Sequence, residues 1–195
     1  MLMTLAVTAS LALSGAPAGA PAGALAGAPA GASAGATQSV TYRGATITLP
    51  ASWKVEKADS GAVHVITGSC SRRATECQGF WLMGPQYIRY ATEGNPFRVD
   101  EPYHPSSGVM ECVRDRRYYS SPMPVKPQVS ELRPVGAGHK AYYRQWKITC
   151  HTPSGKPTSV TYPQRIWYLP ASKILVVDQW STPGLNAALT RAVWR

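Results

Sequence analysis

Apolar and polar residues alternate in the segment TYRGATITLP, which runs from Thr41 to Pro50. In an extended chain, Ala45, Ile47 and Leu49 lie on one face and the threonines between them lie on the other. A period of two residues is typical of a β-strand with one buried face. The pattern therefore predicts a strand that ends at Pro50 and turns its apolar face toward a core.

The segment HKAYYRQWKITC, from His139 to Cys150, alternates in the same way and predicts a longer strand. We expect Tyr142, Trp146 and Ile148 on one side of this strand, and the lysine and threonine that alternate with them on the other side.

Two more strands are expected after residue 160. Residues 164–169 and 173–180 flank the turn sequence Pro170-Ala171-Ser172 and predict a hairpin. The run Ile174-Leu175-Val176-Val177 is apolar without interruption, which is typical of a central strand that is covered on both faces.

A helix is expected near the C-terminus. Thr182 can cap it and Pro183 suits its first position. Its apolar stripe consists of Leu185, Ala188, Leu189, Ala192 and Val193. Together these elements predict an α+β fold, a mostly antiparallel sheet with a C-terminal helix packed on one face.

The segment Tyr90–Pro134 shows little periodicity and is rich in Pro, Gly, Arg and Ser. Pro122, Pro124 and Pro127 favour an extended, polyproline-like chain over a core element.

Residues 1–41 contain no charged and no aromatic side chain, so every Phe, Trp and Tyr lies after them. The apolar stretch Leu2–Leu13 is shorter than the roughly 20 residues that span a bilayer, which disfavours a membrane anchor. We expect a signal peptide at 1–18, although no Lys or Arg precedes Arg43 as it usually does. An Ala/Gly/Pro-rich flexible leader at 19–41 and a single disulfide-bonded domain at 42–195 complete the expected organisation.

The four cysteines of an exported domain favour two disulfides. Cys70 and Cys77 bracket a polar loop between two strand-like runs, where a hairpin would bring them within reach of each other. Among the three possible pairings we favour Cys70–Cys77 and Cys112–Cys150. A zinc site is the alternative, but the C-x2-C spacing is missing, so we expect no metal and no cofactor.

The chain carries a net charge of +10, which favours anionic partners. Its densest basic cluster consists of Arg114, Arg116, Arg117, Tyr118 and Tyr119. These side chains could bind an anionic cell-wall polymer or an extracellular protein. The alternative is a solvated strand edge on which positive charge discourages aggregation. Nucleic acid is not the expected partner outside the cell, and no transmembrane span is expected in the mature form.

No catalytic motif emerges from the spacing of reactive residues. The four histidines do not have the spacing of a metalloprotease helix. His64 lies between two valines of a strand and is expected to be a satisfied surface or half-buried side chain. Ser106, His104 and Asp100 could be written as a triad, but their spacing does not support one.

Two segments resemble the PsbP-like family, which includes exported actinobacterial members. One is Tyr42–Trp53, a first strand that runs into Leu-Pro-Ala-Ser-Trp, and the other is Arg165–Trp194, a Trp-bearing hairpin followed by a terminal helix. The resemblance implies an antiparallel sheet with helical cover and a role in binding or assembly.

We therefore expect a secreted, non-enzymatic binding or accessory protein of the cell envelope that acts through its basic Arg/Tyr surface. A secreted hydrolase whose site is invisible in the sequence is one alternative. The other is a protease inhibitor with Ser121–Gln128 as its reactive loop.

Overall fold

The computed structural model describes residues 35–106, 108–120 and 126–195. The expected signal peptide, most of the expected leader, and Pro122 and Pro124 lie outside these residues. The described strands are β1 (Thr37–Tyr42), β2 (Ala45–Pro50), β3 (Lys54–Lys57), β4 (Val63–Ile66), β5 (Gly79–Met83), β6 (Met110–Cys112), β7 (Asp115–Ser120), β8 (Val129–Pro134), β9 (Lys140–His151), β10 (Pro157–Leu169), β11 (Ile174–Asp178) and β12 (Val193–Trp194). The described helices are α1 (Pro85–Arg89) and α2 (Leu185–Thr190).

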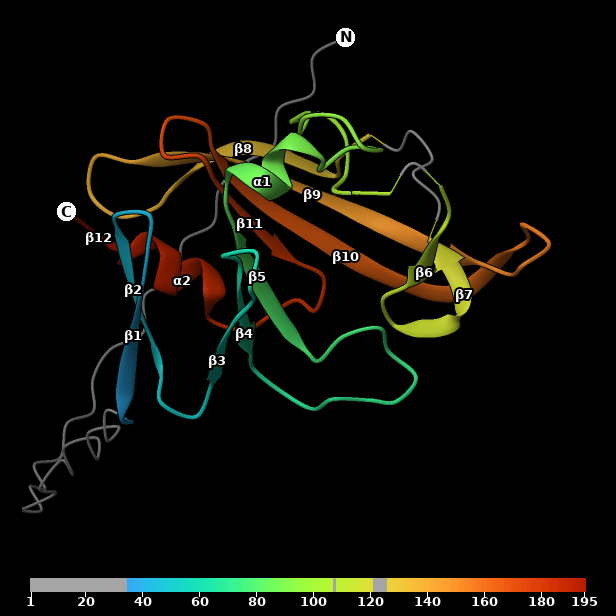
Figure 1. Ribbon diagram of the computed structural model, residues 1–195, viewed down its shortest axis with the longest axis horizontal. Helices are drawn as coiled ribbons and strands as arrows, with labels where there is room; N and C mark the ends of the chain where they lie inside the picture. The colour runs from blue at the N-terminus through green and yellow to red at the C-terminus, as the bar shows by residue number, and fades with distance from the viewer. Residues whose placement is uncertain (1–34, 107, 121–125) are drawn as a thin grey trace, which may run out of the picture. The chain divides into compact units, whose positions relative to one another are not determined.

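The strands form two antiparallel sheets (Figure 1). The larger sheet has the order β3-β4-β5-β11-β10-β9-β7-β6, and β8 also pairs with β9. The smaller sheet has the order β1-β2-β12. The predicted antiparallel sheet and C-terminal helix are therefore present, in a domain that is mostly β.

Strand β11 lies in the middle of the larger sheet and is buried on both faces, as its apolar run predicted. Ile174 and Val176 belong to a core that the smaller sheet and α2 cover. Leu175 and Val177 belong to a second core on the opposite face. The hairpin with β10 is also confirmed, with Leu169 opposite Ile174.

The first predicted strand corresponds to β2, and its Ala45, Ile47 and Leu49 are buried as expected. Its partner β1 begins at Thr37, inside the segment that was expected to be a flexible leader. The domain boundary at residue 42 was therefore too late. A period of two over SVTY was hidden by the Ala/Gly-rich sequence before it.

Strand β9 changes its buried side along its length. Ala141 and Tyr143 pack into the first core, whereas Trp146 and Ile148 pack into the second. Tyr142 shares the side of Trp146 and Ile148 by alternation, but it is 42% exposed, so this side is buried only in the second half of the strand. The first half of the strand faces one core and the second half faces the other, so a single alternating pattern of burial does not describe it.

The C-terminal helix is shorter than expected. Helix α2 starts after Gly184, and the hydroxyl of Thr182 donates to Asp178 instead of capping the helix. Val193 is exposed in β12, which pairs with β2. The predicted cap and the last residue of the predicted stripe were therefore wrong, because the chain leaves the helix to complete the smaller sheet.

The segment Tyr90–Pro134, in which the sequence showed little periodicity, contributes both core residues and strands within its described parts. Ala91, Phe97 and Val113 are buried in the second core. Strands β6, β7 and β8 also arise from this segment. Their short lengths and mixed composition explain why no period was visible.

Both expected disulfides are confirmed. Cys70 and Cys77 close the loop between β4 and β5, with 4.1 Å between their Cα atoms. Cys112 of β6 and Cys150 of β9 are bonded over a Cα separation of 5.8 Å, which ties the β6–β7 hairpin to the end of β9. Neither helix in the described residues has the length and hydropathy needed to cross a membrane.

The two disulfides should differ in their contribution to stability. By loop entropy, the bridge across 7 residues contributes about 2.4 kcal/mol and the bridge across 38 residues about 3.9 kcal/mol. We expect the pair C112S/C150S to lower the free energy of unfolding more than the pair C70S/C77S does. Urea unfolding of both variants measures this, and the reverse order would contradict the entropic account.

Candidate ligand-binding cavity

A cavity of about 520 Å³ opens on the face of the larger sheet that carries the second core. Its floor consists of side chains from neighbouring strands: Trp81 and Met83 of β5, Val177 of β11, Tyr162 of β10 and Ile148 of β9. Antiparallel pairing places Trp81 directly opposite Val177, so their side chains share this face. The sheet therefore supplies a mostly apolar floor.

The cavity wall is built from segments that carry little regular structure. Tyr87 of α1, the segment Pro102–Pro105 and the hairpin residues Met110 and Val113 contribute to it. Figure 1 shows α1 and the hairpin β6–β7 toward separate ends of the long strands β9 and β10.

Gln164 attaches the wall to the floor. This side chain on β10 is 2% exposed, and its Oε1 accepts a hydrogen bond from the Tyr103 amide over 2.7 Å. Its Nε2 donates to the Tyr103 carbonyl over 2.9 Å. The amide group thus pairs with the backbone of Tyr103 as a neighbouring strand would, and satisfies both of its backbone groups.

Glu76 is the carboxylate on the cavity wall that lies deepest. The indole Nε1 of Trp81 donates to Glu76 Oε2 over 2.6 Å. Burial raises the pKa of Glu76, and the indole groups of Trp81 and Trp180 oppose this rise. The neighbouring charge of Asp178 adds to it. Glu76 therefore titrates above the usual range of a glutamate.

The ring of Trp81 is held in place by His64. The two rings stack with centroids 4.2 Å apart and planes 5° apart. His64 points away from Val63 and Val65 as expected, but it is buried and its Nε2 has no hydrogen-bond partner. Its expected role as a satisfied side chain was therefore wrong. Burial lowers the pKa of His64, which favours the neutral imidazole in this stack.

His104 also lines the cavity. It is 5% exposed, and its Nδ1 lies 2.9 Å from the carbonyl oxygen of Ser106. Because a carbonyl can only accept, Nδ1 donates in this hydrogen bond. The Nε2 of the ring is buried without a partner among the described residues, so it does not face the cavity.

The residues Ser106, His104 and Asp100 do not form a triad among the described contacts. His104 binds the backbone carbonyl of Ser106, and the Ser106 hydroxyl accepts from the Gly108 amide over 3.1 Å.

Two of the tyrosines that line the cavity, Tyr103 and Tyr162, are neutral. Burial raises the pKa of Tyr162 to about 12 and also raises the pKa of Tyr103.

The predicted basic cluster is divided by the structure. Arg116 lies 3.7 Å from Glu111, and Arg117 pairs with Asp115 over 2.6 Å. The hydrogen bonds from Arg117 lower the pKa of Asp115 to about 2. Tyr118 and Tyr119 are half-buried. Arg116 and Arg117 are thus exposed cations that already contact carboxylates.

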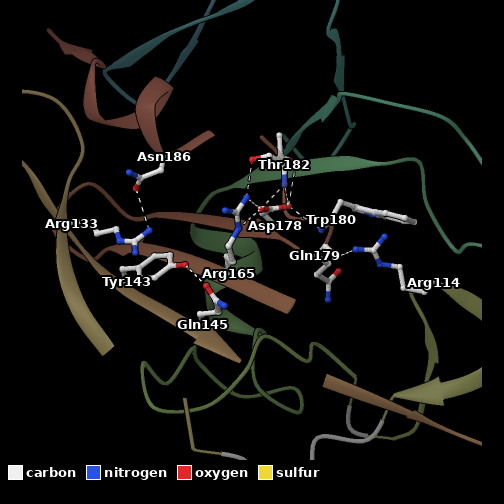
Figure 2. Close-up of polar contacts among 10 residues, drawn as sticks. All are labelled: Arg114, Arg133, Tyr143, Gln145, Arg165, Asp178, Gln179, Trp180, Thr182 and Asn186. Atoms are coloured by element: carbon white, nitrogen blue, oxygen red, sulfur yellow. Dashed lines mark hydrogen bonds and ion pairs between the residues drawn. The ribbon is translucent and has the colours of Figure 1, made fainter. Parts of the chain in front are cut away.

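Arg114, the third arginine of the cluster, turns inward (Figure 2). Its guanidinium lies 4.0 Å from the ring centre of Trp180, and its Nη2 donates to the Gln179 carbonyl over 3.1 Å. Burial lowers the pKa of Arg114. The five cluster residues therefore do not form one common contact surface.

The loop that carries Gln179 and Trp180 is fixed by the buried carboxylate of Asp178 (Figure 2). Asp178 accepts from the Trp180 amide over 2.9 Å and from Arg165 Nε over 2.6 Å. Arg165 also donates to the Thr182 carbonyl over 2.9 Å. This network connects the end of β11 to the start of α2 and holds one side of the cavity.

The sequence did not reveal these cavity residues. Glu76, Tyr87, Tyr103 and Gln164 lie far apart in the chain, and no motif spacing joins them. The one available signal was Asp178, a charged residue at the end of the apolar run of β11, with Arg165 on the predicted partner strand.

No protein-family model matches this chain, and neither a curated protein nor a solved structure matches it. Within the described residues, no three His, Cys, Asp or Glu side chains are grouped so that they could hold a metal ion. The arrangement can hold a small apolar molecule and offer it one carboxylate acceptor, Glu76.

Glu76 should make stability depend on pH. A carboxyl whose pKa is raised in the folded state stabilises the fold below the unfolded pKa, and this contribution is lost as pH rises through the folded pKa. We expect Glu76→Gln to raise the melting temperature at pH 7.5, because glutamine still accepts from Trp81 and carries no charge. The difference should disappear below the ordinary pKa of 4.5. Equal differences at pH 4 and pH 7.5 in thermal melts would contradict this.

The two environments of the arginines give another test. We expect Arg114→Ser to cost about 1–2 kcal/mol, because it removes the contact with Trp180 and a hydrogen bond. The matched variant Arg116→Ser should cost about 0.5 kcal/mol or less, because its ion pair is exposed. Chemical denaturation measures both, and equal costs would show that Arg114 is not anchored in solution.

Proposed function

We propose that this chain is an exported binding protein that takes up a small, largely apolar molecule in the cavity. The observation that carries the proposal is the cavity itself, about 520 Å³ with an apolar floor and a few polar groups. Small-molecule sites typically occupy roughly 300–1,000 Å³ and share this composition. The two disulfides support an oxidising compartment outside the cytoplasm.

A binding role is better supported than hydrolysis. Among the described residues, no histidine forms a hydrogen bond with a hydroxyl group or a carboxylate. Nucleophilic catalysis requires such a pair to activate the attacking oxygen. The inhibitor alternative depends on the segment Ser121–Gln128, of which residues 121–125 lie outside the described residues.

Binding of an anionic cell-wall polymer or an extracellular protein through the basic cluster stays a prediction, as does the resemblance to the PsbP-like family. The ion pairs of Arg116 and Arg117 weaken the case for the cluster, because a polyanion would have to compete with Glu111 and Asp115. The described residues of the cavity floor carry no charged group that would compete with a ligand in this way.

The proposal predicts that the neutral naphthalene dye prodan binds in the cavity. Energy transfer from tryptophan to the dye reports binding, because Trp81 lies on the cavity floor. Thr75 lines the cavity and has an exposed side chain, so Thr75→Trp should obstruct it and weaken binding at least tenfold.

The matched control is Thr48→Trp, which places the same indole on the exposed face of β2. This variant should bind the dye as the parent does. Equal binding by both variants would place the dye elsewhere and contradict the proposal.

A further inference from the structure

We propose that the cavity prefers a molecule with an apolar body and a protonated primary amine, whose ammonium group is bound by the carboxylate of Glu76. This inference rests on the proposed function, since it names the class of ligand that the same cavity takes. Three independent features support it: the charges, the hydrogen-bonding groups and the aromatic rings of the cavity.

The charges of the cavity oppose the net charge of the chain. The chain carries +10, yet none of the described residues that line the cavity is Lys or Arg. Two glutamates, Glu76 and Glu111, line the cavity. Glu111 already pairs with Arg116. Glu76 makes no ion pair within the described part of the chain. A partly buried carboxylate without a counter-ion is costly, and a ligand ammonium would offset that cost.

The groups around Glu76 do not neutralise its negative charge. Burial raises the pKa of Glu76, and the negative charge of Asp178 adds to this rise. The indole of Trp81 donates one neutral hydrogen bond, which leaves the charge in place. Arg114 is not paired with Glu76, because its guanidinium stacks on Trp180 and donates to the Gln179 carbonyl.

The hydrogen-bonding groups indicate a ligand that donates. A carboxylate only accepts hydrogen bonds, and the Glu76 carboxylate receives one from the Trp81 indole at Oε2. A primary ammonium carries three donors and can serve the remaining lone pairs of this carboxylate, whereas a quaternary ammonium carries none.

The aromatic rings add a third source of affinity for a cation. Trp81, Tyr87 and Tyr103 all line the cavity. Aromatic faces attract ammonium groups, and the attraction grows when water is excluded. The remaining floor, with Met83, Ile148 and Val177, suits an apolar chain or ring attached to the amine.

Three probes of similar size and different charge test the inference. Calorimetry at pH 7.5 compares 4-phenylbutylamine, 4-phenylbutanol and 4-phenylbutyrate as ligands of the purified chain. We expect the amine to bind at least tenfold more tightly than the alcohol, and the carboxylate to bind most weakly.

Glu76→Gln should reduce the preference for the amine over the alcohol to about threefold or less while the alcohol binds as before, because the apolar floor is unchanged. The control Glu131→Gln removes the same charge from exposed β8 and should keep the full preference. Alcohol binding shows that each variant retains a folded cavity.

The outcomes separate the two proposals. If none of the three probes binds the parent chain, the proposed function fails and this inference fails with it. If all three bind with similar affinity and Thr75→Trp blocks them, the cavity binds apolar molecules and the preference for an amine is wrong. A preference that survives in Glu76→Gln would also overturn the inference.

Discussion

Burial of β11 on both faces is the constraint on which the rest of the structure depends. Its alternate side chains enter two separate cores, so each face of the larger sheet must be covered by other parts of the chain. The smaller sheet and α2 cover one face with regular structure. The opposite face is covered by α1, irregular segments and the β6–β7 hairpin, and there the packing leaves the cavity. One face of β11 therefore packs closely against the smaller sheet and α2, and the other face belongs to the side of the larger sheet that carries the cavity.

The irregular cover remains in place because a few polar groups and one disulfide attach it. Gln164 pairs with the backbone of Tyr103, and Cys150 holds the β6–β7 hairpin through Cys112. At the end of β11, Asp178 orders the loop that follows, as Figure 2 shows. Each of these groups lies at or beside a strand of the floor. The rigid sheet thus positions a wall that has little secondary structure of its own.

The distribution of charge separates the surface from the cavity. Arginines dominate the exterior, where Arg116 and Arg117 pair with carboxylates at low cost. Inside, burial raises the pKa of Glu76 and of the neighbouring tyrosines, and His104 keeps an unpaired nitrogen. Polar groups left without partners in a partly enclosed space reduce stability. The proposed ligand binding rests on such a group, Glu76, in the wall of the cavity.

Local pattern determined β2, the β10–β11 hairpin, the double burial of β11 and the Cys70–Cys77 bridge, because each depends on residues that are near one another in the sequence. The Cys112–Cys150 bridge followed from the sequence only as the remaining pair. Only the tertiary structure decided that Tyr142 is exposed, that Thr182 bonds to Asp178, and that Arg114 turns away from its cluster. It also decided which distant residues meet in the cavity. The reason is physical: alternation specifies which side chains share a face of a strand, but the side that is buried depends on what the rest of the chain places against it.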